Sequence, residues 1–343
     1  MENFRTHSAL SASHVALVPT PYVATHFETI ASDLRDGGVN VTIFKSVQEC
    51  LSKHREQAID VILAMHNFPM SRDFLSATPG LRAALSFITG TEGFDENAAT
   101  DLGIIVANGQ IPENFHSMAE ATILLMLAAF YDLNGAQRNL REKQSSSGQL
   151  RAKMLMGKTV GIVGFGKIAR ALTVRLAAWG IRIQVYTRRP DVTLPHPLVR
   201  VELDDLCRTS DCIVLLANLN SESRHLLDER RLKLIKPGAI LVNTARGGLI
   251  DERKLVEVAK QGRFRMLALD TFEHEPLADD SPLRTLPNTI LTGHDVGHTV
   301  ETHEAMVATA VENIMRILRG QLPSNIRNPI VIDRWLSRWH KPT

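Results

Sequence analysis

Short runs of apolar residues alternate with helix-length segments along almost the whole chain. Short apolar runs bounded by turn residues are typical of buried strands, and helical stretches between them are typical of βαβ units. The pattern therefore predicts parallel β-sheets with helices in the connections. The expected strands cover residues 15–18, 39–44, 61–65, 84–88, 104–107, 159–163, 181–186, 212–216, 239–242, 266–269 and 289–291.

The expected strands form two successive series, and an unusually apolar helix lies between them. Residues 117–133 are rich in Ala, Leu and Met, and Ser117 with Glu120 three residues later fits a capping box at the helix start. A final helix is expected over residues 301–319, with Gly320 as its C′ residue. The length of 343 residues, at about 150 residues per domain, is consistent with two α/β domains.

The composition excludes several classes of protein. Hydrophobic residues make up 44% of the chain and charged residues 22%, which is enough apolar material to bury a core. The formal net charge of +2 lacks the strong basic excess of nucleic-acid-binding proteins, so we expect no nucleic-acid partner. The longest apolar run, residues 123–131, is far shorter than the ~20 residues of a membrane span, so we expect no membrane partner.

The N-terminus and the cysteines bear on the cellular compartment. Residues 1–5 do not form a basic segment followed by an apolar one, so we expect no secretory signal. Cys50, Cys207 and Cys212 are odd in number and lack the spacing of a metal site. We therefore expect buried free thiols in a reducing compartment, no metal ion and a cytoplasmic protein.

A glycine-rich turn opens the second series. Gly164-x-Gly166-x-x-Ala169 follows an expected strand and starts an expected helix. In a dinucleotide-binding turn the first glycine permits the tight turn, the second lets the backbone approach the pyrophosphate, and the third position needs a small residue. The phosphates would lie at the positive end of the helix. The pattern predicts a dinucleotide site; the alternative is a tight turn without a ligand.

The end of the next strand bears on which dinucleotide is bound. An NAD site usually places a carboxylate there, on the ribose hydroxyls, whereas this chain has no carboxylate before Asp191. Thr187, Arg188 and Arg189 occupy that position instead and could hold a 2′-phosphate. We therefore expect NADP as the preferred cofactor, with NAD possible. In the alternative interpretation the arginines are solvated loop charges and NAD binds without an acidic partner.

Three further residues lie just beyond expected strands of the second series. They are Arg246, Glu275 and His294. The carboxyl ends of parallel strands meet at one edge of the sheet, where open α/β sheets bind ligands. Each residue alone has an ordinary structural explanation, such as a surface ion pair or a hydrogen bond. Together with the glycine turn they predict an active site.

With these motifs the chain resembles the D-isomer-specific 2-hydroxyacid dehydrogenases, which include glyoxylate and hydroxypyruvate reductases, D-lactate dehydrogenase and phosphoglycerate dehydrogenase. The resemblance covers about residues 60–330, in four ordered motifs with matching spacing. It implies that Arg246 binds the substrate carboxylate and polarises the keto oxygen. It also implies that His294 is the general acid in reduction and the base in oxidation, and that Glu275 pairs with it and orients it.

Three neighbouring residues compete for the acid/base roles. His274 and His298 are alternative histidines, but His294 matches the family position after Leu-Thr-x. Glu273 is an alternative carboxylate, but Glu275 directly precedes the proline of the motif. The resemblance therefore assigns the catalytic residues as Arg246, Glu275 and His294.

The resemblance also implies a set of cofactor-binding residues and exposes some departures from the family. Gly293 replaces the usual proline before the catalytic histidine, and Asp295 adds a negative charge after it. Asn218 stands where a proline is common at the cofactor-facing end of a strand. The expected cofactor-binding residues are Gly164, Phe165, Gly166, Lys167, Ile168, Thr187, Arg188, Arg189, Asn218, Thr244, Ala245, Asp270 and Gly297.

The first series fits the family's substrate domain, which also receives the C-terminal helix. The expected fold is thus two flavodoxin- or Rossmann-like domains with parallel sheets, in which a cofactor domain (109–299) is inserted into a discontinuous substrate domain (1–108 and 300–343). A loop containing Glu92 and Gly93 resembles the glycine loop that holds the substrate carboxylate. The expected substrate-binding residues are His66, Asn67, Glu92, Gly93 and Arg246.

The expected function follows from this resemblance. The nearest arginine to the loop that tunes substrate choice is Arg72, so a small unphosphorylated 2-oxoacid is favoured over a phosphorylated one. We expect an oxidoreductase that reduces it to a D-2-hydroxyacid with NADPH, and a homodimer held by residues 117–133 and the polar segment 138–153. The alternatives are a dinucleotide-sensing corepressor-like binding protein, an NAD-dependent D-2-hydroxyacid or phosphoglycerate dehydrogenase, and a dehydrogenase acting on formate.

Overall fold

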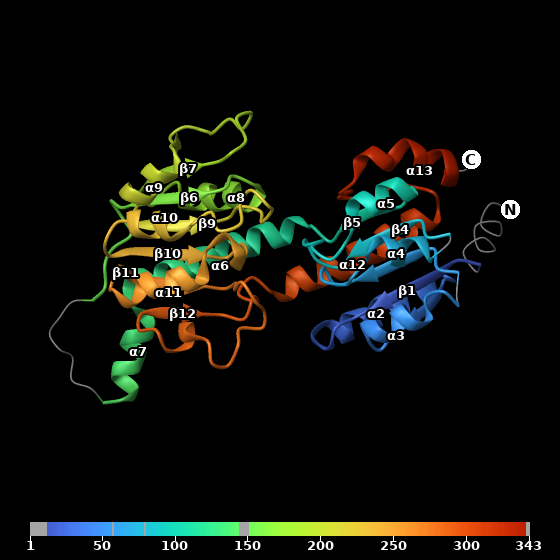
Figure 1. Cartoon of the computed structure of the whole chain (residues 1–343), viewed down its shortest axis with the longest axis horizontal. Coiled ribbons are helices and arrows are strands. Elements are labelled where there is room, and N and C mark those ends of the chain that lie inside the picture. Colours follow the sequence, from blue (N-terminus) through green and yellow to red (C-terminus); the bar gives the residue numbers. More distant parts are fainter. Residues whose placement is uncertain (1–11, 57, 79, 144–150, 341–343) are drawn as a thin grey trace. The chain divides into compact units, whose positions relative to one another are not determined.

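The computed structural model describes residues 12–56, 58–78, 80–143 and 151–340, so that part of the polar segment 138–153 lies outside the described residues. The chain divides into two compact units (Figure 1): unit 1 comprises residues 1–113 and 299–343, and unit 2 comprises residues 114–298. Unit 2 is therefore an insertion in unit 1. Among the described helices, none has both the length and the apolar character needed to cross a membrane.

Unit 1 contains a five-stranded parallel sheet with the order β2-β1-β3-β4-β5. This is the flavodoxin-like order, whose switch point lies between β1 and β3. Val15 of β1 lies opposite Val41 of β2 on one side and Val61 of β3 on the other. The strands are β1 (His14–Val18), β2 (Asn40–Ile43), β3 (Val61–Ala64), β4 (Ala83–Ser86) and β5 (Ile105–Asn108).

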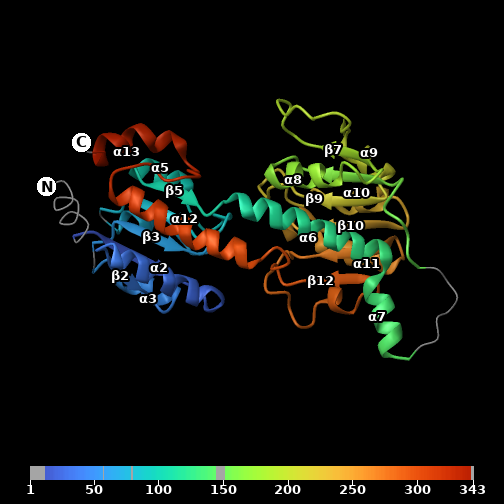
Figure 2. The same cartoon turned by 180° about the vertical axis from the view of Figure 1, so that it is seen from behind.

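The helices of unit 1 cover both faces of this sheet (Figure 2). One face packs against α2 (Ala24–Asp36), α12 (Val300–Leu318) and α13 (Ile332–Trp339), and the other against α3 (Val47–Lys53), α4 (Arg72–Ser76) and α5 (Glu96–Leu102). Trp335 of α13 is fully buried, and its indole N–H donates to the Arg82 carbonyl over 2.9 Å. The C-terminal segment is thus part of the core of unit 1. Two 3-10 turns complete it, η1 (Pro21–Val23) and η4 (Pro329–Val331).

Unit 2 contains a seven-stranded parallel sheet with the order β12-β11-β10-β9-β6-β7-β8. The six strands from β6 to β11 have the Rossmann order when they are numbered in chain order, and the switch point lies between β6 and β9. The strands are β6 (Thr159–Val163), β7 (Arg182–Tyr186), β8 (Val199–Arg200), β9 (Cys212–Leu215), β10 (Ala239–Asn243), β11 (Phe264–Leu269) and β12 (Thr289–Leu291).

The sheet of unit 2 is also covered on both faces. One face packs against α6 (Pro112–Tyr131) and α8 (Lys167–Leu176), and the other against α9 (Leu203–Thr209), α10 (Glu229–Leu234) and α11 (Glu252–Lys260). Every residue of β6, β9 and β10 is buried, which explains why these strands are apolar throughout. The remaining elements are α7 (Leu133–Arg141), η2 (Gly247–Leu249) and η3 (Pro282–Thr285).

The predicted fold class is confirmed, and each expected strand coincides with an observed one. The expected start of the helix at Ser117 is wrong: α6 begins at Pro112, because a proline is well accommodated in the first turn of a helix. Ser117 lies inside the helix and is buried, and its hydroxyl donates to the Gly297 carbonyl over 2.6 Å. The final helix starts as expected, capped by Thr299, and Gly320 adopts a left-handed φ of 73° after it.

Candidate active site

The glycine-rich turn joins β6 to α8 at the switch point of the unit 2 sheet. Gly164 has a φ of 96°, and a Cβ there would lie 2.7 Å from the Ala217 amide nitrogen in the segment after β9. Gly164 is therefore required by the fold itself. Gly166 is different, because it precedes the first residue of α8 with a φ of −90°, and a Cβ built on it would meet no described atom within 4 Å.

The contrast between the two glycines fits a dinucleotide. The fold of the chain does not require a glycine at position 166. A side chain there would fill the space in front of the backbone, and a pyrophosphate needs that space to approach the backbone closely. The amides at the start of α8 and the positive end of its dipole suit an anion. Of the other expected residues here, Phe165 is buried, and the Lys167 ammonium lies 4.8 Å from the centre of the Phe115 ring. Ile168 is the second residue of α8.

The loop after β7 brings the expected phosphate-binding residues together but also gives them partners. An Nη atom of Arg188 lies 2.6 Å from a carboxylate oxygen of Glu222, and the other Nη atom lies 3.3 Å from the Asn220 side-chain oxygen. Arg189 donates to the Phe165 carbonyl over 3.1 Å, which ties this loop to the glycine turn. The Thr187 hydroxyl accepts from the Arg189 amide over 3.3 Å.

Sequence reasoning missed Glu222 and Asn220. Asn220 organises the loop after β9, because its side-chain oxygen also accepts from the Glu222 and Ser223 amides. Asn218 is exposed in this loop, and its carbonyl accepts from the Ser223 hydroxyl over 2.7 Å. The Asn-x-x-Ser pattern at residues 220–223 is a local turn signal. The contact of Asn220 with Arg188, however, joins segments that are distant in sequence.

The segment after β10 holds Arg246. The Asn243 side chain bridges it, donating to the Arg246 carbonyl over 3.0 Å and accepting from the Ala245 amide over 3.1 Å. The buried Thr244 hydroxyl lies 3.0 Å from that of Thr122 on α6. The Arg246 guanidinium donates to the Ala245 carbonyl over 2.8 Å. Asn243 was not expected, although an asparagine that ends a buried strand is a recognisable signal.

Glu275 and His294 form a hydrogen-bonded pair. The His294 Nδ1 atom lies 2.7 Å from one carboxylate oxygen of Glu275, and the Phe272 amide donates to the other over 3.0 Å. Burial alone would raise the pKa of Glu275, but these hydrogen bonds and the charges of His294 and Arg246 outweigh it, so its pKa is lowered. His294 has a left-handed φ of 64°, which is uncommon for a non-glycine residue and characteristic of functional sites.

The segment that carries His294 is anchored by Asp270. This buried carboxylate accepts from the Thr292 hydroxyl over 2.6 Å and from the Asp295 and Val296 amides over 3.2 and 3.3 Å. Asp270 therefore fixes the backbone on both sides of His294. Further on, Gly297 packs so closely against α6 that a Cβ would meet the side chain of Met118.

The competing residues lie in different surroundings. Desolvation and the charge of His294 lower the pKa of His298, while Asp295 and Asp270 partly offset this effect. Glu273 does not pair with His294; it accepts from His225 Nε2 over 2.6 Å and from the Glu252 amide over 3.2 Å. Of the two carboxylates, only Glu275 contacts the histidine that the motif selects.

The expected substrate-binding residues of unit 1 follow β3 and β4 at the carboxyl edge of its sheet. The Gly93 amide donates to the His66 carbonyl over 2.7 Å, and a Cβ on Gly93 would lie 2.4 Å from the Phe68 carbonyl oxygen. Gly93 therefore holds the two loops together, and its N–H is already engaged. Glu92 is exposed, and Asn67 belongs to the loop that packs against Gly93.

Known proteins share the sequence pattern of this chain. Residues 123–295 match the family model described as "D-isomer specific 2-hydroxyacid dehydrogenase, NAD binding domain". The chain is 35% identical to D-3-phosphoglycerate dehydrogenase of Methanocaldococcus jannaschii over 85% of its own length, but it spans only 56% of that relative. It is 31% identical to glyoxylate reductase of Thermococcus litoralis, covering 82% of this chain and 87% of the relative.

A solved structure shares the architecture. The crystal structure of a glyoxylate reductase from Paecilomyes thermophila superimposes with a TM-score of 0.78 at 27% identity, covering 92% of this chain and 98% of the other. The chain belongs to the D-isomer-specific 2-hydroxyacid dehydrogenase family. This is a family of NAD(P)-dependent oxidoreductases, as the sequence motifs predicted.

Proposed function

We propose that this protein reduces a small, unphosphorylated 2-oxoacid of the glyoxylate or hydroxypyruvate type to a D-2-hydroxyacid with NADPH. The observation that carries the proposal is the hydrogen bond of 2.7 Å between Glu275 and His294, at the carboxyl edge of a Rossmann sheet and next in the fold to the Arg246 segment. A histidine paired with a carboxylate is suited to move a proton at neutral pH.

In this proposal each polar residue has a distinct task. Arg246 binds the substrate carboxylate with its planar array of N–H donors. His294 delivers a proton to the oxygen of the keto group, and the Glu275 carboxylate orients the imidazole and stabilises its charged form. The nicotinamide cofactor, held by the turn from Gly164 to Ile168, supplies the hydride when bound. Thr244, Ala245, Asp270 and Gly297 line the cofactor side of these segments.

The decisive test is a panel of 2-oxoacids assayed with NADPH and NADH in parallel. We expect turnover of glyoxylate or hydroxypyruvate, and His294→Asn should lower kcat by ~10²–10⁴ while cofactor affinity stays nearly unchanged. His298→Asn is the matched control and should retain most of the activity. Loss of turnover in the His298 variant but not in the His294 variant would refute the assignment.

The absence of a phosphate-binding cation supports the unphosphorylated substrate. The loops after β3, β4 and β5, residues 65–70, 87–93 and 108–110, contain no lysine or arginine. The nearest arginine, Arg72, forms an ion pair of 2.5 Å with Asp101 of α5 instead. The 31% identity to a glyoxylate reductase supports this choice, whereas the 35% identity to D-3-phosphoglycerate dehydrogenase fits the phosphorylated alternative. Efficient reduction of a phosphorylated 2-oxoacid, with poor turnover of glyoxylate, would contradict this assignment.

The preference for NADPH rests on the residues after β7. Thr187, Arg188 and Arg189 replace the carboxylate that favours NAD, although Arg188 is paired with Glu222 and a 2′-phosphate would have to take over that guanidinium. Charge-assisted contacts are worth ~1.5–3 kcal/mol each. Replacing both arginines by serine should therefore reduce kcat/KM for NADPH far more than for NADH. Equal losses, or a native preference for NADH, would remove the proposal.

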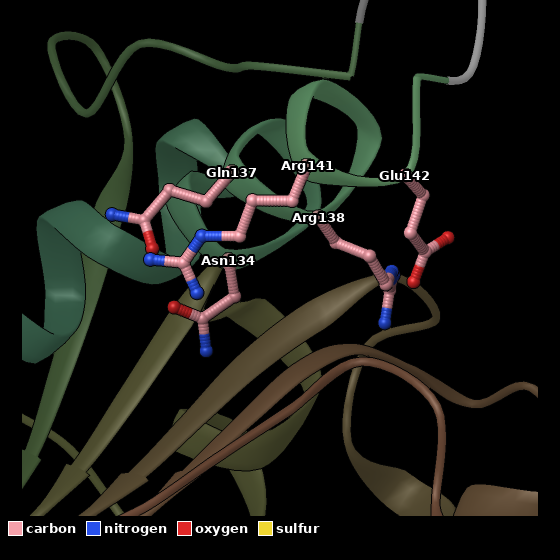
Figure 3. A pocket seen from close by; sticks show the side chains of 5 residues that line it. All are labelled: Asn134, Gln137, Arg138, Arg141 and Glu142. Atoms are coloured by element: carbon pink, nitrogen blue, oxygen red, sulfur yellow. The ribbon is translucent and has the colours of Figure 1, made fainter.

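We also propose a homodimer. The helices α6 and α7 and the segment before β6 expose large apolar side chains, of which Leu140 is 83% exposed. A pocket of about 400 Å³ is lined by four residues of α7 and by the residue that follows it: Asn134, Gln137, Arg138, Arg141 and Glu142 (Figure 3). A patch that carries both charges and apolar groups can pair with its own copy about a two-fold axis. Sedimentation velocity should show a dimer that Leu140→Glu dissociates, and a monomeric wild type at micromolar concentration would contradict this.

A further inference from the structure

Glu273 lies two residues before Glu275 and joins three segments of unit 2. One of its carboxylate oxygens accepts from His225 Nε2 over 2.6 Å and from the Arg224 guanidinium over 3.2 Å. The other oxygen accepts from the amide of Glu252, the first residue of α11, over 3.2 Å. The Glu273 side chain is 15% exposed, whereas Arg224 is 59% exposed, so the bonds to His225 and Glu252 are better shielded from water than the bond to Arg224.

The bond to α11 is reciprocated. The Glu273 amide donates to a carboxylate oxygen of Glu252 over 3.0 Å, so that each residue accepts from the backbone of the other. Burial and the nearby charge of Glu273 raise the pKa of Glu252, while the hydrogen bond from the Glu273 amide works in the opposite direction. Two carboxyl groups in such contact are tolerated because His225, Arg224 and the positive end of α11 face Glu273.

The same point is where the Arg246 segment meets the Glu275 segment. A Cβ on Gly247 would lie 1.8 Å from the Phe272 carbonyl carbon and 2.4 Å from the Glu273 amide nitrogen. The His225 amide also donates to the Gly248 carbonyl over 2.8 Å. Arg246 is therefore next to the backbone contact between Gly247 and Phe272–Glu273, and the Glu273 side chain stabilises the segment on one side of that contact.

We infer that Glu273 is a positioning residue, which holds the Glu275 and Arg246 segments in register for the proton and carboxylate contacts of the reaction. The inference rests on the proposed roles of Glu275, His294 and Arg246. Glu273 uses both of its oxygens as acceptors, and its neighbour Phe272 donates the amide hydrogen bond that orients Glu275. Removing the acceptor bonds of Glu273 would therefore make the position of the Glu275 carboxylate less well defined. It would not remove any group that touches the substrate.

The experiment compares Glu273→Gln with Asp204→Asn in the full-length protein. Both oxygens of Glu273 accept hydrogen bonds, but the NH2 group of a glutamine can only donate. In either orientation, a glutamine at position 273 therefore loses the bonds to one set of donors. Asp204 is a matched control, since its carboxylate also uses both oxygens, toward Arg230 and Arg231, but it joins α9 to α10. The measurements are kcat and KM for the 2-oxoacid, the pH profile of reduction, and the thermal midpoint Tm.

We expect Glu273→Gln to lower kcat by ~10–100-fold, the effect of a small misplacement of catalytic groups, with little change in cofactor affinity. Its pH profile should move to lower pH, as in Glu275→Gln, and in a Glu275→Gln background the second substitution should cost little more. Asp204→Asn should lower Tm without moving kcat or the profile. His225→Asn, which tolerates the left-handed φ of 50°, should give a smaller loss in the same direction.

Two results would overturn the inference. The first is an unchanged kcat and pH profile in Glu273→Gln together with a lowered Tm, which is the behaviour of the Asp204 control. The second is a full multiplicative loss when the Glu273 and Glu275 substitutions are combined. If Glu275→Gln itself leaves reduction intact, the proposed function fails and this inference falls with it. If Glu275→Gln is impaired and Glu273→Gln is not, only the inference falls.

Discussion

Replacing Glu275 by glutamine tests the acid/base pair directly. The substitution keeps the size of the side chain and an acceptor for the Phe272 amide, but it removes the negative charge 2.7 Å from His294 Nδ1. An exposed ion pair contributes ~0.2–1 kcal/mol and a charge-assisted hydrogen bond ~1.5–3 kcal/mol. The two side chains are 32% and 34% exposed, so a value between these ranges applies. We take about 1.4 kcal/mol for the interaction, near the lower end of the range for a charge-assisted hydrogen bond.

The sign of the shift follows from the direction of the reaction. Reduction needs a protonated imidazole, and the Glu275 carboxylate, whose pKa is lowered, is ionised throughout the neutral range and stabilises that proton. Without the carboxylate the proton donor loses its negative partner, so the alkaline limit of reduction should move to lower pH. The pair contributes to the free energy of unfolding at pH values above ~4.3, the pKa of a glutamate in the unfolded chain. This contribution is lost as the pH falls below that value.

The assay is kcat/KM for glyoxylate with NADPH, measured across the range in which a histidine titrates. Asp279→Asn is the matched control, because Asp279 is a fully exposed carboxylate whose ion pair with Arg284 is distant, at 3.9 Å. The control should show the wild-type profile. An unchanged or raised alkaline limit in the Glu275 variant would refute the reasoning.

Three further predictions concern the fold of unit 2. Gly166→Ala should weaken NADPH binding without lowering Tm, whereas Gly164→Ala should lower Tm. The reason is that, of these two glycines, only Gly164 has a left-handed φ and a crowded Cβ position. Equal effects of the two substitutions in cofactor titrations and thermal melts would contradict this. Ser117→Ala leaves the buried Gly297 carbonyl without its partner and should cost ~1–3 kcal/mol, visible in calorimetry. The pKa of Asp204 is lowered to about 2, so Asp204→Asn should destabilise the protein above ~3.9, with the difference vanishing as the pH falls toward 2 in acid-unfolding curves.

The sequence predicted the local features of this molecule well. The buried strands are continuous apolar runs, and the glycine turn and the C′ glycine at 320 depend on residues that are adjacent in the chain. Such features are fixed by short-range sterics and hydrogen bonds, so they are visible in the sequence. The start of α6 was mistaken because a serine and a glutamate in the right spacing are a weaker signal than the proline at 112.

The contacts that the sequence did not predict join segments far apart in the chain. Glu222 meets Arg188, Glu273 meets His225, and Asp270 accepts from the backbone beside His294. Each contact depends on the order of the strands in the sheet, because β7 and β9 flank β6, β9 and β11 flank β10, and β11 lies next to β12. That order is a property of the whole fold. For the same reason the residues of the Glu275–His294 pair could be named from the motif, while the residues that hold them could not.

The hydrogen bond from Ser117 to Gly297 bears on how one chain accommodates an insertion of this size. It joins positions 180 residues apart, close to the first and last residues of unit 2. An insertion whose ends are clasped together acts on the surrounding chain as a short loop, because the conformational entropy of closing a loop depends on the span between its ends. The strands of unit 1 can therefore pair with the returning segment, as the amide of Asn108 does with the Asn325 carbonyl, at little entropic cost from the intervening residues. The length of the inserted unit therefore adds little to the entropic cost of joining the two parts of unit 1.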